Sequence, residues 1–247
     1  MAIKTIDFIE EDYGTFDAAG FAAETFSSQE NLAAVLDHTL LKPDATQQQV
    51  LQLCKEAAEN RFACAMVNPT WASLSVQELR GTGISVGSVI GFPLGASLTS
   101  TKRQEAQALV TLGVHDLDMV INVGQLKSGD LAAVERDIRT VAEAVHDNGA
   151  ILKVILETCL LSIEEKLRAS DIAINAGTDF LKTSTGLSTA GATVTDVAIL
   201  RGVAGARCGV KAAGGIRTLA DARTMLEAGA NRIGTSAGIK ILTEMTG

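Results

Sequence analysis

The chain has 247 residues, of which 47% are hydrophobic and 20% are charged, and it carries a net charge of −8. This length and composition favour a folded protein that buries about three quarters of its unfolded surface, and they exclude a largely disordered chain. The acidic balance argues against a nonspecific binder of nucleic acid or of an anionic membrane surface, because such binding needs an excess of basic residues. No run of about 18 apolar residues is present, so we expect no membrane-spanning segment.

The sequence of the first 30 residues predicts a helical extension that precedes the main domain. Phe8, Phe16, Phe21 and Phe26 lie among acidic residues there. We expect this segment to pack on the exterior or the bottom of the domain that follows, and a partner-binding arm is the alternative. The acidic residues interrupt any apolar run of the signal-peptide kind, and the cysteines lack a disulfide or metal spacing, so we expect a cytoplasmic protein with reduced thiols.

Eight strand-like segments follow, and helical segments separate them. Several of these strands come a few residues after a glycine that ends the preceding helix, which is the usual C-terminal cap. Helices also open with a capping-box pattern, in which Thr46, Ser162 and Thr218 are each followed three residues later by Gln or an acidic residue. The predicted strands are residues 37–41, 62–68, 85–91, 116–122, 151–157, 180–183, 208–211 and 232–234.

Strands that alternate with helices imply parallel βαβ units, and eight of them fit a closed (β/α)8 barrel better than an open sheet. We therefore expect an α/β protein in which residues 1–30 form the N-terminal extension and residues 31–247 form one (β/α)8 TIM barrel. Catalytic residues of such barrels lie at the carboxyl ends of the strands and in the loops that follow them.

Charged side chains occur inside several of the predicted strands: Asp118, Lys153, Glu157, Lys182 and Lys211. Side chains alternate across a strand, so these residues converge if their shared faces point inward, and we expect Lys153 to pair with Asp118. A buried ammonium costs several kcal/mol unless it is paired or loses its proton, and an unprotonated lysine is a nucleophile. A structural ion pair is the alternative for any one lysine, but the convergence of several favours chemistry.

Glycine and hydroxyl residues follow the last two predicted strands. Gly214 and Gly215 follow the seventh strand, and Gly234, Thr235 and Ser236 follow the eighth. These are the loops in which (β/α)8 barrels often bind phosphate, since glycine lets backbone amides approach an anion and the following helix adds its dipole. Ordinary glycine turns with a helix cap are the alternative. The two segments together favour a phosphorylated small molecule.

A metal site is not indicated. His38, His115 and His146 are scattered, and we expect His38 to be hydrogen-bonded at the barrel end instead of catalytic. The cysteines show no metal-ligand spacing either. They are Cys54, Cys64, Cys159 and Cys208.

Four segments carry a resemblance to a known family. They are LDHTL at residues 36–40, DLDMVIN at 116–122, KTSTG at 182–186 and VKAAGGIR at 210–217. In sequence and order they resemble the deoxyribose-phosphate aldolases, and the similarity runs from about Leu36 to Leu242. The resemblance implies a class I aldolase without metal or other cofactor, which interconverts 2-deoxy-D-ribose 5-phosphate with D-glyceraldehyde 3-phosphate and acetaldehyde.

The resemblance also implies roles for individual residues. Lys182 would form the Schiff base, Lys211 would be the neighbouring lysine that tunes it, and Asp118 would move protons. For Lys182 to attack an aldehyde near pH 7, its pKa must lie about three units below the reference value, and a nearby cation together with desolvation can lower it. The residues expected to hold the substrate phosphate are Gly186, Gly214, Gly215, Gly234, Thr235 and Ser236.

Two positions depart from the family pattern. Leu187 stands where some members have a lysine that assists phosphate binding, so we expect a weaker preference for phosphorylated substrates. Met66 stands where many members have a cysteine, so we expect fewer thiol adducts with unsaturated aldehydes, although Cys64 shares the same strand face.

Another Schiff-base lyase, such as a transaldolase, and a noncatalytic phosphate-binding barrel are the alternative functions. We expect a homodimer or a homotetramer; the sequence does not fix which, since barrel exteriors offer many apolar helix faces.

Overall fold

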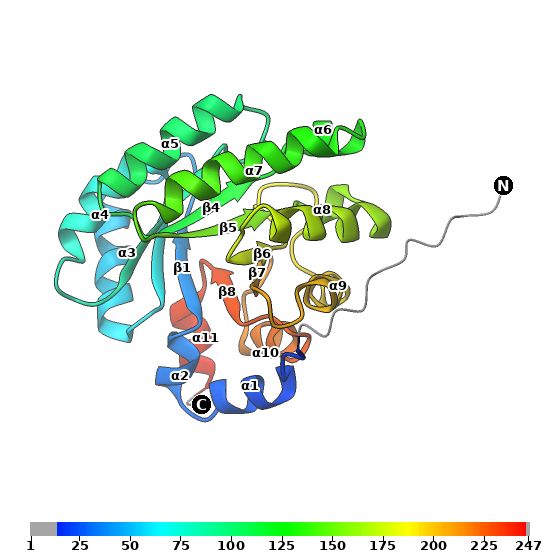
Figure 1. Cartoon of the computed structure of the whole chain (residues 1–247). Coiled ribbons are helices and arrows are strands. Elements are labelled where there is room, and N and C mark those ends of the chain that lie inside the picture. The colour runs from blue at the N-terminus through cyan, green and yellow to red at the C-terminus, as the bar shows by residue number, and fades with distance from the viewer. Residues whose placement is uncertain (1–13, 246–247) are drawn as a thin grey trace.

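Eight parallel strands close into a barrel in the computed structural model, which describes residues 14–245 (Figure 1). Each strand pairs with its neighbours in chain order, and β1 pairs with β8 to close the barrel. The strands are β1 (Leu36–Leu40), β2 (Cys64–Val67), β3 (Ser85–Ile90), β4 (Asp116–Val120), β5 (Ile151–Ile155), β6 (Phe180–Lys182), β7 (Gly209–Ala213) and β8 (Arg232–Thr235). The predicted (β/α)8 barrel is confirmed.

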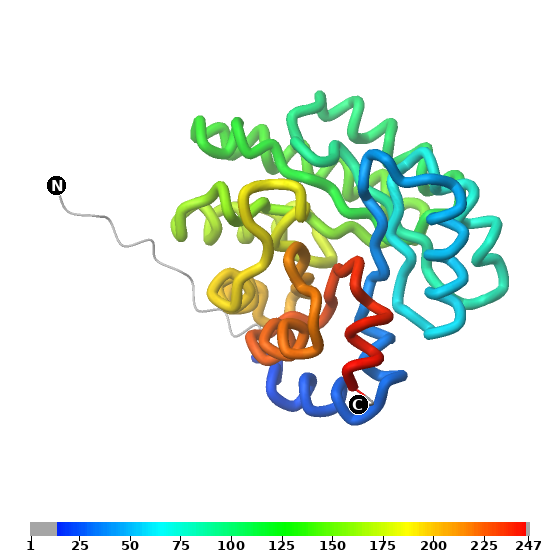
Figure 2. Tube along the Cα trace, turned by 180° about the vertical axis from the view of Figure 1, so that it is seen from behind, coloured from blue at the N-terminus to red at the C-terminus, as the bar shows by residue number. Residues whose placement is uncertain are grey.

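Helices surround the barrel on its outside (Figures 1 and 2). They are α1 (Ala18–Thr25), α2 (Gln29–Ala33), α3 (Gln47–Asn60), α4 (Ala72–Glu78), α5 (Thr99–Thr111), α6 (Val123–Lys127), α7 (Leu131–His146), α8 (Ile163–Asn175), α9 (Val194–Ala204), α10 (Leu219–Glu227) and α11 (Gly238–Glu244), with short 3-10 turns at η1 (Pro69–Trp71) and η2 (Thr158–Leu160). Within residues 14–245, none of these helices is long and apolar enough to cross a membrane.

The predicted helix ends agree with the structure. Thr46, Ser162 and Thr218 each accept a hydrogen bond from the backbone three residues later, and all three capping boxes are complete. The glycines that were predicted to end helices have the positive φ that favours this residue type, as at Gly113 (97°) and Gly177 (98°).

Some strand bounds differ from the prediction. Strand β7 continues to Ala213 instead of ending at Lys211, and β5 ends at Ile155 instead of residue 157. The reason at β5 is conformational, because Glu157 has a φ of 56° and begins the turn η2. Strand β2 runs from Cys64 to Val67 instead of from residue 62 to residue 68, and, as predicted, it ends before Pro69, which cannot donate to a sheet ladder.

The strand residues divide between two faces. Apolar side chains point outward and form the core between barrel and helices, among them Leu117, Met119, Leu152, Val154, Leu181, Val210 and Ile233. The residues between them in sequence therefore point into the barrel. The register places Asp118 beside Lys153, Lys182 beside Lys211, and Lys211 beside Arg232. Strand alternation thus brings the charged residues together inside the barrel.

Helices α1 and α2 pack against the C-terminal helices α10 and α11, and Figures 1 and 2 show them side by side. The Arg201 and Arg223 guanidinium groups lie over the rings of Phe16 and Phe26, at 4.1 and 4.0 Å. Phe8 lies outside the described residues. These contacts agree with the predicted packing of an extension on the barrel exterior, and the boundary at residue 30 stays a prediction.

Candidate active site

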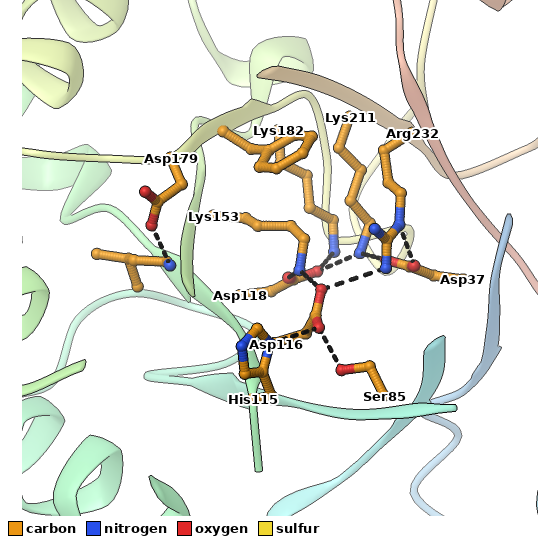
Figure 3. Close-up of polar contacts among 12 residues, drawn as sticks. Asp37, Ser85, His115, Asp116, Asp118, Lys153, Asp179, Lys182, Lys211 and Arg232 are labelled. Carbon is orange, nitrogen blue, oxygen red and sulfur yellow. Dashed lines mark hydrogen bonds and ion pairs between the residues drawn. The ribbon is translucent and has the colours of Figure 1, made fainter. Parts of the chain in front are cut away.

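Three lysines meet one carboxylate inside the barrel (Figure 3). Lys182 Nζ and Lys211 Nζ donate to Asp118 Oδ2 at 2.7 and 2.6 Å, and Lys153 Nζ lies 3.4 Å from Asp118 Oδ1. All four residues are buried, with Lys182 3% exposed and the others not exposed at all. The structure therefore brings together Lys182, Lys211 and Asp118, as the sequence predicted, and it pairs Lys153 with Asp118.

This buried, charged environment shifts the pKa values of Asp118 and Lys182. Burial alone would raise the pKa of Asp118, but Lys182, Lys211 and Lys153 outweigh it and hold that pKa well below its usual range, so Asp118 is a carboxylate. Burial lowers the pKa of Lys182 to about 8; the Asp118 carboxylate opposes this decrease, and Lys211 adds to it. The sequence predicted this direction with Lys211 and desolvation as causes, and in the structure desolvation is the larger of the two.

Three further charged residues of the barrel interior were missed as site residues. Arg232 Nε lies 2.5 Å from Asp37 Oδ1, and its Nη2 lies 3.2 Å from Asp116 Oδ1. Asp37 Oδ2 lies 2.5 Å from Lys211 Nζ, and Asp116 Oδ1 accepts a hydrogen bond from Lys153. The sequence could have indicated Asp116, because it lies two residues before Asp118 and so shares its strand face.

A pocket of about 270 Å³ opens above Lys182 at the carboxyl ends of the strands. Every residue predicted to hold phosphate lines this pocket together with Lys182: Gly186, Gly214, Gly215, Gly234, Thr235 and Ser236. A Cβ atom on Gly214 would lie 3.0 Å from the Cα of Gly191 and 3.2 Å from that of Gly186. Because Gly214 also has a φ of 89°, these loops can approach each other this closely only with glycine.

Charged and apolar side chains also line the pocket. Lys42 and Arg217 also line it and add two cations that were not predicted as site residues. Thr235 Oγ1 already donates to the Ile216 carbonyl at 2.7 Å and accepts from the Ala237 amide at 2.9 Å. Leu187, 53% exposed, lines the pocket as an apolar residue.

Glu157 does not join the lysines, although it was predicted to converge with them. Its carboxylate accepts hydrogen bonds from the Thr185 amide at 3.2 Å and from the Thr185 hydroxyl at 2.5 Å. The chain leaves the strand geometry at Glu157, so the side chain reaches the loop after β6. Glu157 therefore fixes the segment that follows Lys182.

The histidines and cysteines lie apart from the pocket. His38 Nε2 lies 2.7 Å from Glu56 Oε2, in agreement with the hydrogen-bonded role predicted for His38. Cys64 and Met66 are fully buried inside the barrel, and burial, with Asp116 and Asp37, raises the pKa of the Cys64 thiol well above its ordinary value. Across residues 14–245, no group of three or more His, Cys, Asp or Glu could hold a metal ion.

The closed barrel, with its lysine-centred interior below a glycine-lined pocket, places the chain in the class of (β/α)8-barrel enzymes. Comparison with known proteins narrows this class. A family model described as "DeoC/LacD family aldolase" matches residues 32–244, and the chain belongs to that family.

Relatives and solved structures agree with this family. The chain is 53% identical over 212 residues to a deoxyribose-phosphate aldolase of Listeria welshimeri, an alignment covering 86% of this chain and 95% of the relative. It is 50% identical, with the same coverage, to one of Bacillus mycoides. A tetrameric deoxyribose phosphate aldolase from Aeropyrum pernix has a similar structure, with a TM-score of 0.86 and 35% identity, and the match covers 93% of this chain and 97% of that one.

Proposed function

We propose that the protein is a class I aldolase that reversibly cleaves 2-deoxy-D-ribose 5-phosphate to D-glyceraldehyde 3-phosphate and acetaldehyde through an imine on Lys182. One observation carries the proposal: in a chain about half identical to deoxyribose-phosphate aldolases, the buried amine of Lys182 lines the pocket and has a pKa of about 8. At this pKa roughly a tenth of the amine is unprotonated at pH 7, far more than for a solvated lysine, so it can attack an aldehyde.

The reaction begins when the Lys182 nitrogen adds to the aldehyde carbon of the open-chain sugar and water leaves. The resulting protonated imine withdraws electrons from the bond between C2 and C3. When a base takes the proton of the C3 hydroxyl, that bond breaks, glyceraldehyde 3-phosphate leaves, and an enamine remains on Lys182. Protonation of the enamine at C2 and addition of water then release acetaldehyde and the free amine.

Asp118 is the proposed base, acting directly or through a water molecule. Its Oδ2 holds Lys182 and Lys211, whereas its Oδ1 accepts no hydrogen bond from the described residues and has only the Lys153 ammonium nearby, at 3.4 Å, so Oδ1 is the oxygen proposed to take the proton. Lys211 holds this carboxylate in place and adds positive charge beside the amine. The protonated imine itself supplies the electron withdrawal that a metal would supply in other aldolases, so the proposed reaction needs no metal or cofactor.

The glycine-lined pocket is the proposed phosphate site. Gly186, Gly214, Gly215, Gly234 and Ser236 would offer backbone amides or a hydroxyl, and Thr235 would contribute through its backbone since its hydroxyl is already bonded. Binding the phosphate there uses a remote group to position C3. Lys42 and Arg217 would add attraction that offsets the apolar Leu187.

We also propose that the protein forms a homodimer or a homotetramer and works in the cytoplasm. The relative from Aeropyrum pernix, which is described as tetrameric, supports the proposed oligomer.

The test is an assay of acetaldehyde release from 2-deoxy-D-ribose 5-phosphate. We expect activity in the wild type, unchanged activity with a chelator, and none in Lys182→Leu at any pH. Lys55→Leu, which removes an exposed lysine of α3, is the control and should keep full activity. Turnover of a dihydroxyacetone donor without acetaldehyde release would instead support a transaldolase-type lyase. The absence of any turnover would contradict the proposal.

A further inference from the structure

The charged side chains inside the barrel form a closed ring in which acids and bases alternate (Figure 3). Asp118 contacts Lys211, Lys211 contacts Asp37, and Asp37 contacts Arg232. Arg232 contacts Asp116, Asp116 contacts Lys153, and Lys153 returns to Asp118. Three carboxylates therefore meet three cations, and each ring cation touches two carboxylates.

Lys182 is the seventh charged group of this cluster, and it stands outside the ring. It contacts one carboxylate oxygen, Asp118 Oδ2, which it shares with Lys211. With all seven groups ionised, four cations face three carboxylates, and the cluster carries one surplus positive charge. The cluster becomes neutral when Lys182 loses its proton. An unbalanced charge is costly in such a buried place, so the complete ring favours the neutral amine.

We propose that Arg232 and Asp116, which meet across the ring from Lys182, are positioning residues that set the charge balance on which the reactivity of Lys182 depends. This inference rests on the proposed function. The structure supplies the geometry, since Arg232 pairs with Asp37 and Asp116, and Asp116 pairs with Lys153, so other members of the ring join both residues to Lys182. Arg232 is well suited to this task because a guanidinium group stays protonated and bridges two carboxylates.

The charged and titratable groups around Lys182 come from every side of the barrel. They are Asp37 on β1, Cys64 on β2, Asp116 and Asp118 on β4, Lys153 on β5, Lys211 on β7 and Arg232 on β8, with Glu157 bound to Thr185 and with Lys42 and Arg217 on the pocket wall. Burial opposes the charged forms of Lys153 and Arg232, but their carboxylate neighbours outweigh it and raise the pKa of both, whereas that of Lys182 falls to about 8. Among these three bases, Lys182 loses its proton most readily.

The test measures the pH midpoint of imine formation with acetaldehyde, trapped by borohydride at short times, in variants that change the ring charge. Arg232→Met removes a positive charge, so it should raise the midpoint by on the order of one pH unit. Asp116→Asn removes a negative charge and should lower the midpoint. The double variant restores neutrality and should return the midpoint toward the wild-type value.

Two control variants distinguish an effect of ring charge from an effect of side-chain packing. Arg232→Lys keeps the charge and should keep the midpoint near that of the wild type. Arg139→Met removes an exposed arginine of α7 and should change nothing. A purely structural role of the ring would lower the amount of imine in both single variants without moving their midpoints in opposite directions, and that result would overturn the inference.

His115 allows the same test at the surface, in case changes inside the ring prevent folding. Its side chain is 55% exposed, and its Nδ1 lies 3.4 Å from Asp116 Oδ2. His115→Lys should lower the midpoint of imine formation, and His115→Glu should raise it, by less than the changes inside the ring. Equal midpoints in these two variants would overturn the inference. Failure of the proposed function looks different, because the wild type would then form no imine at all.

Discussion

Lys182 and Lys211 share one oxygen of Asp118, yet the two lysines have different surroundings. Lys211 has a second carboxylate, Asp37, 2.5 Å away, and it does not line the pocket. Lys182 has Asp118 as its ion-pair partner and lines the pocket wall. Lys211 is therefore held between two carboxylates away from the pocket, whereas Lys182, with one partner and access to substrate, is suited to be the nucleophile.

Replacing Lys211 should therefore impair Lys182 through its protonation. In Lys211→Leu, the Asp118 carboxylate pairs more strongly with Lys182, and a neighbouring positive charge is lost, so the pKa of Lys182 rises. We expect activity at neutral pH to fall about tenfold for each unit of this rise, because the unprotonated fraction falls accordingly. The pH dependence of kcat/KM measures the effect, and activity should partly recover at alkaline pH. A low activity that does not increase with pH would show that Lys211 acts in another way.

At the residue scale, the sequence predicted the centre of the site better than its surroundings. Alternation along the strands, together with the resemblance to aldolases, was enough to select Lys182, Lys211 and Asp118. Arg232 and Asp37 were not selected, because their contact joins strands at the two ends of the chain. That contact depends on the register between β8 and β1, which the spacing within either strand does not contain.

At the element scale, a buried ion pair ties two helices to the end of β4. Lys102 of α5 donates to Asp137 Oδ2 of α7 at 2.5 Å and to the Val120 carbonyl at 3.0 Å. Thr99 Oγ1 donates to the other oxygen of Asp137 at 2.8 Å. Lys102 is not exposed, and Asp137 is only 2% exposed. The sequence does not predict this pair, since a lysine on a predicted helix is expected to be solvated.

Removal of one partner leaves a buried carboxylate without its cation. We expect Lys102→Met to lower the free energy of unfolding by about 3–5 kcal/mol, measured by urea denaturation. The double variant Lys102→Met/Asp137→Leu removes both charges and should recover much of the loss. If Lys102→Met were as stable as the wild type, the pair would not hold these helices to the barrel.

Capping and turn residues were predicted well at this scale because they depend on a few neighbouring residues. The three capping boxes and the glycines after the helices agree with the structure. Strand ends were predicted less well. Just after β5, Glu157 adopts a positive φ and bonds to Thr185, 28 residues further along the chain, and no local pattern indicates this contact.

At the scale of the whole molecule, barrel closure creates the site. The ring of charges takes residues from β1, β4, β5, β7 and β8, and Lys182 from β6 completes the cluster. The sequence could predict the barrel from its repeated strand-helix order. The ring itself could not be predicted, because it exists only when β1 and β8 meet.

The central claim is that Lys182, among the lysines of the chain, forms the covalent bond with substrate. Borohydride reduction of the intact protein in the presence of 2-deoxy-D-ribose 5-phosphate or acetaldehyde, followed by mass mapping of its peptides, tests this claim most directly. We predict one reduced adduct, on the peptide that contains Lys182, and none in Lys182→Leu. An adduct on Lys211 or Lys153 in its place, or no adduct in the active protein, would contradict the account.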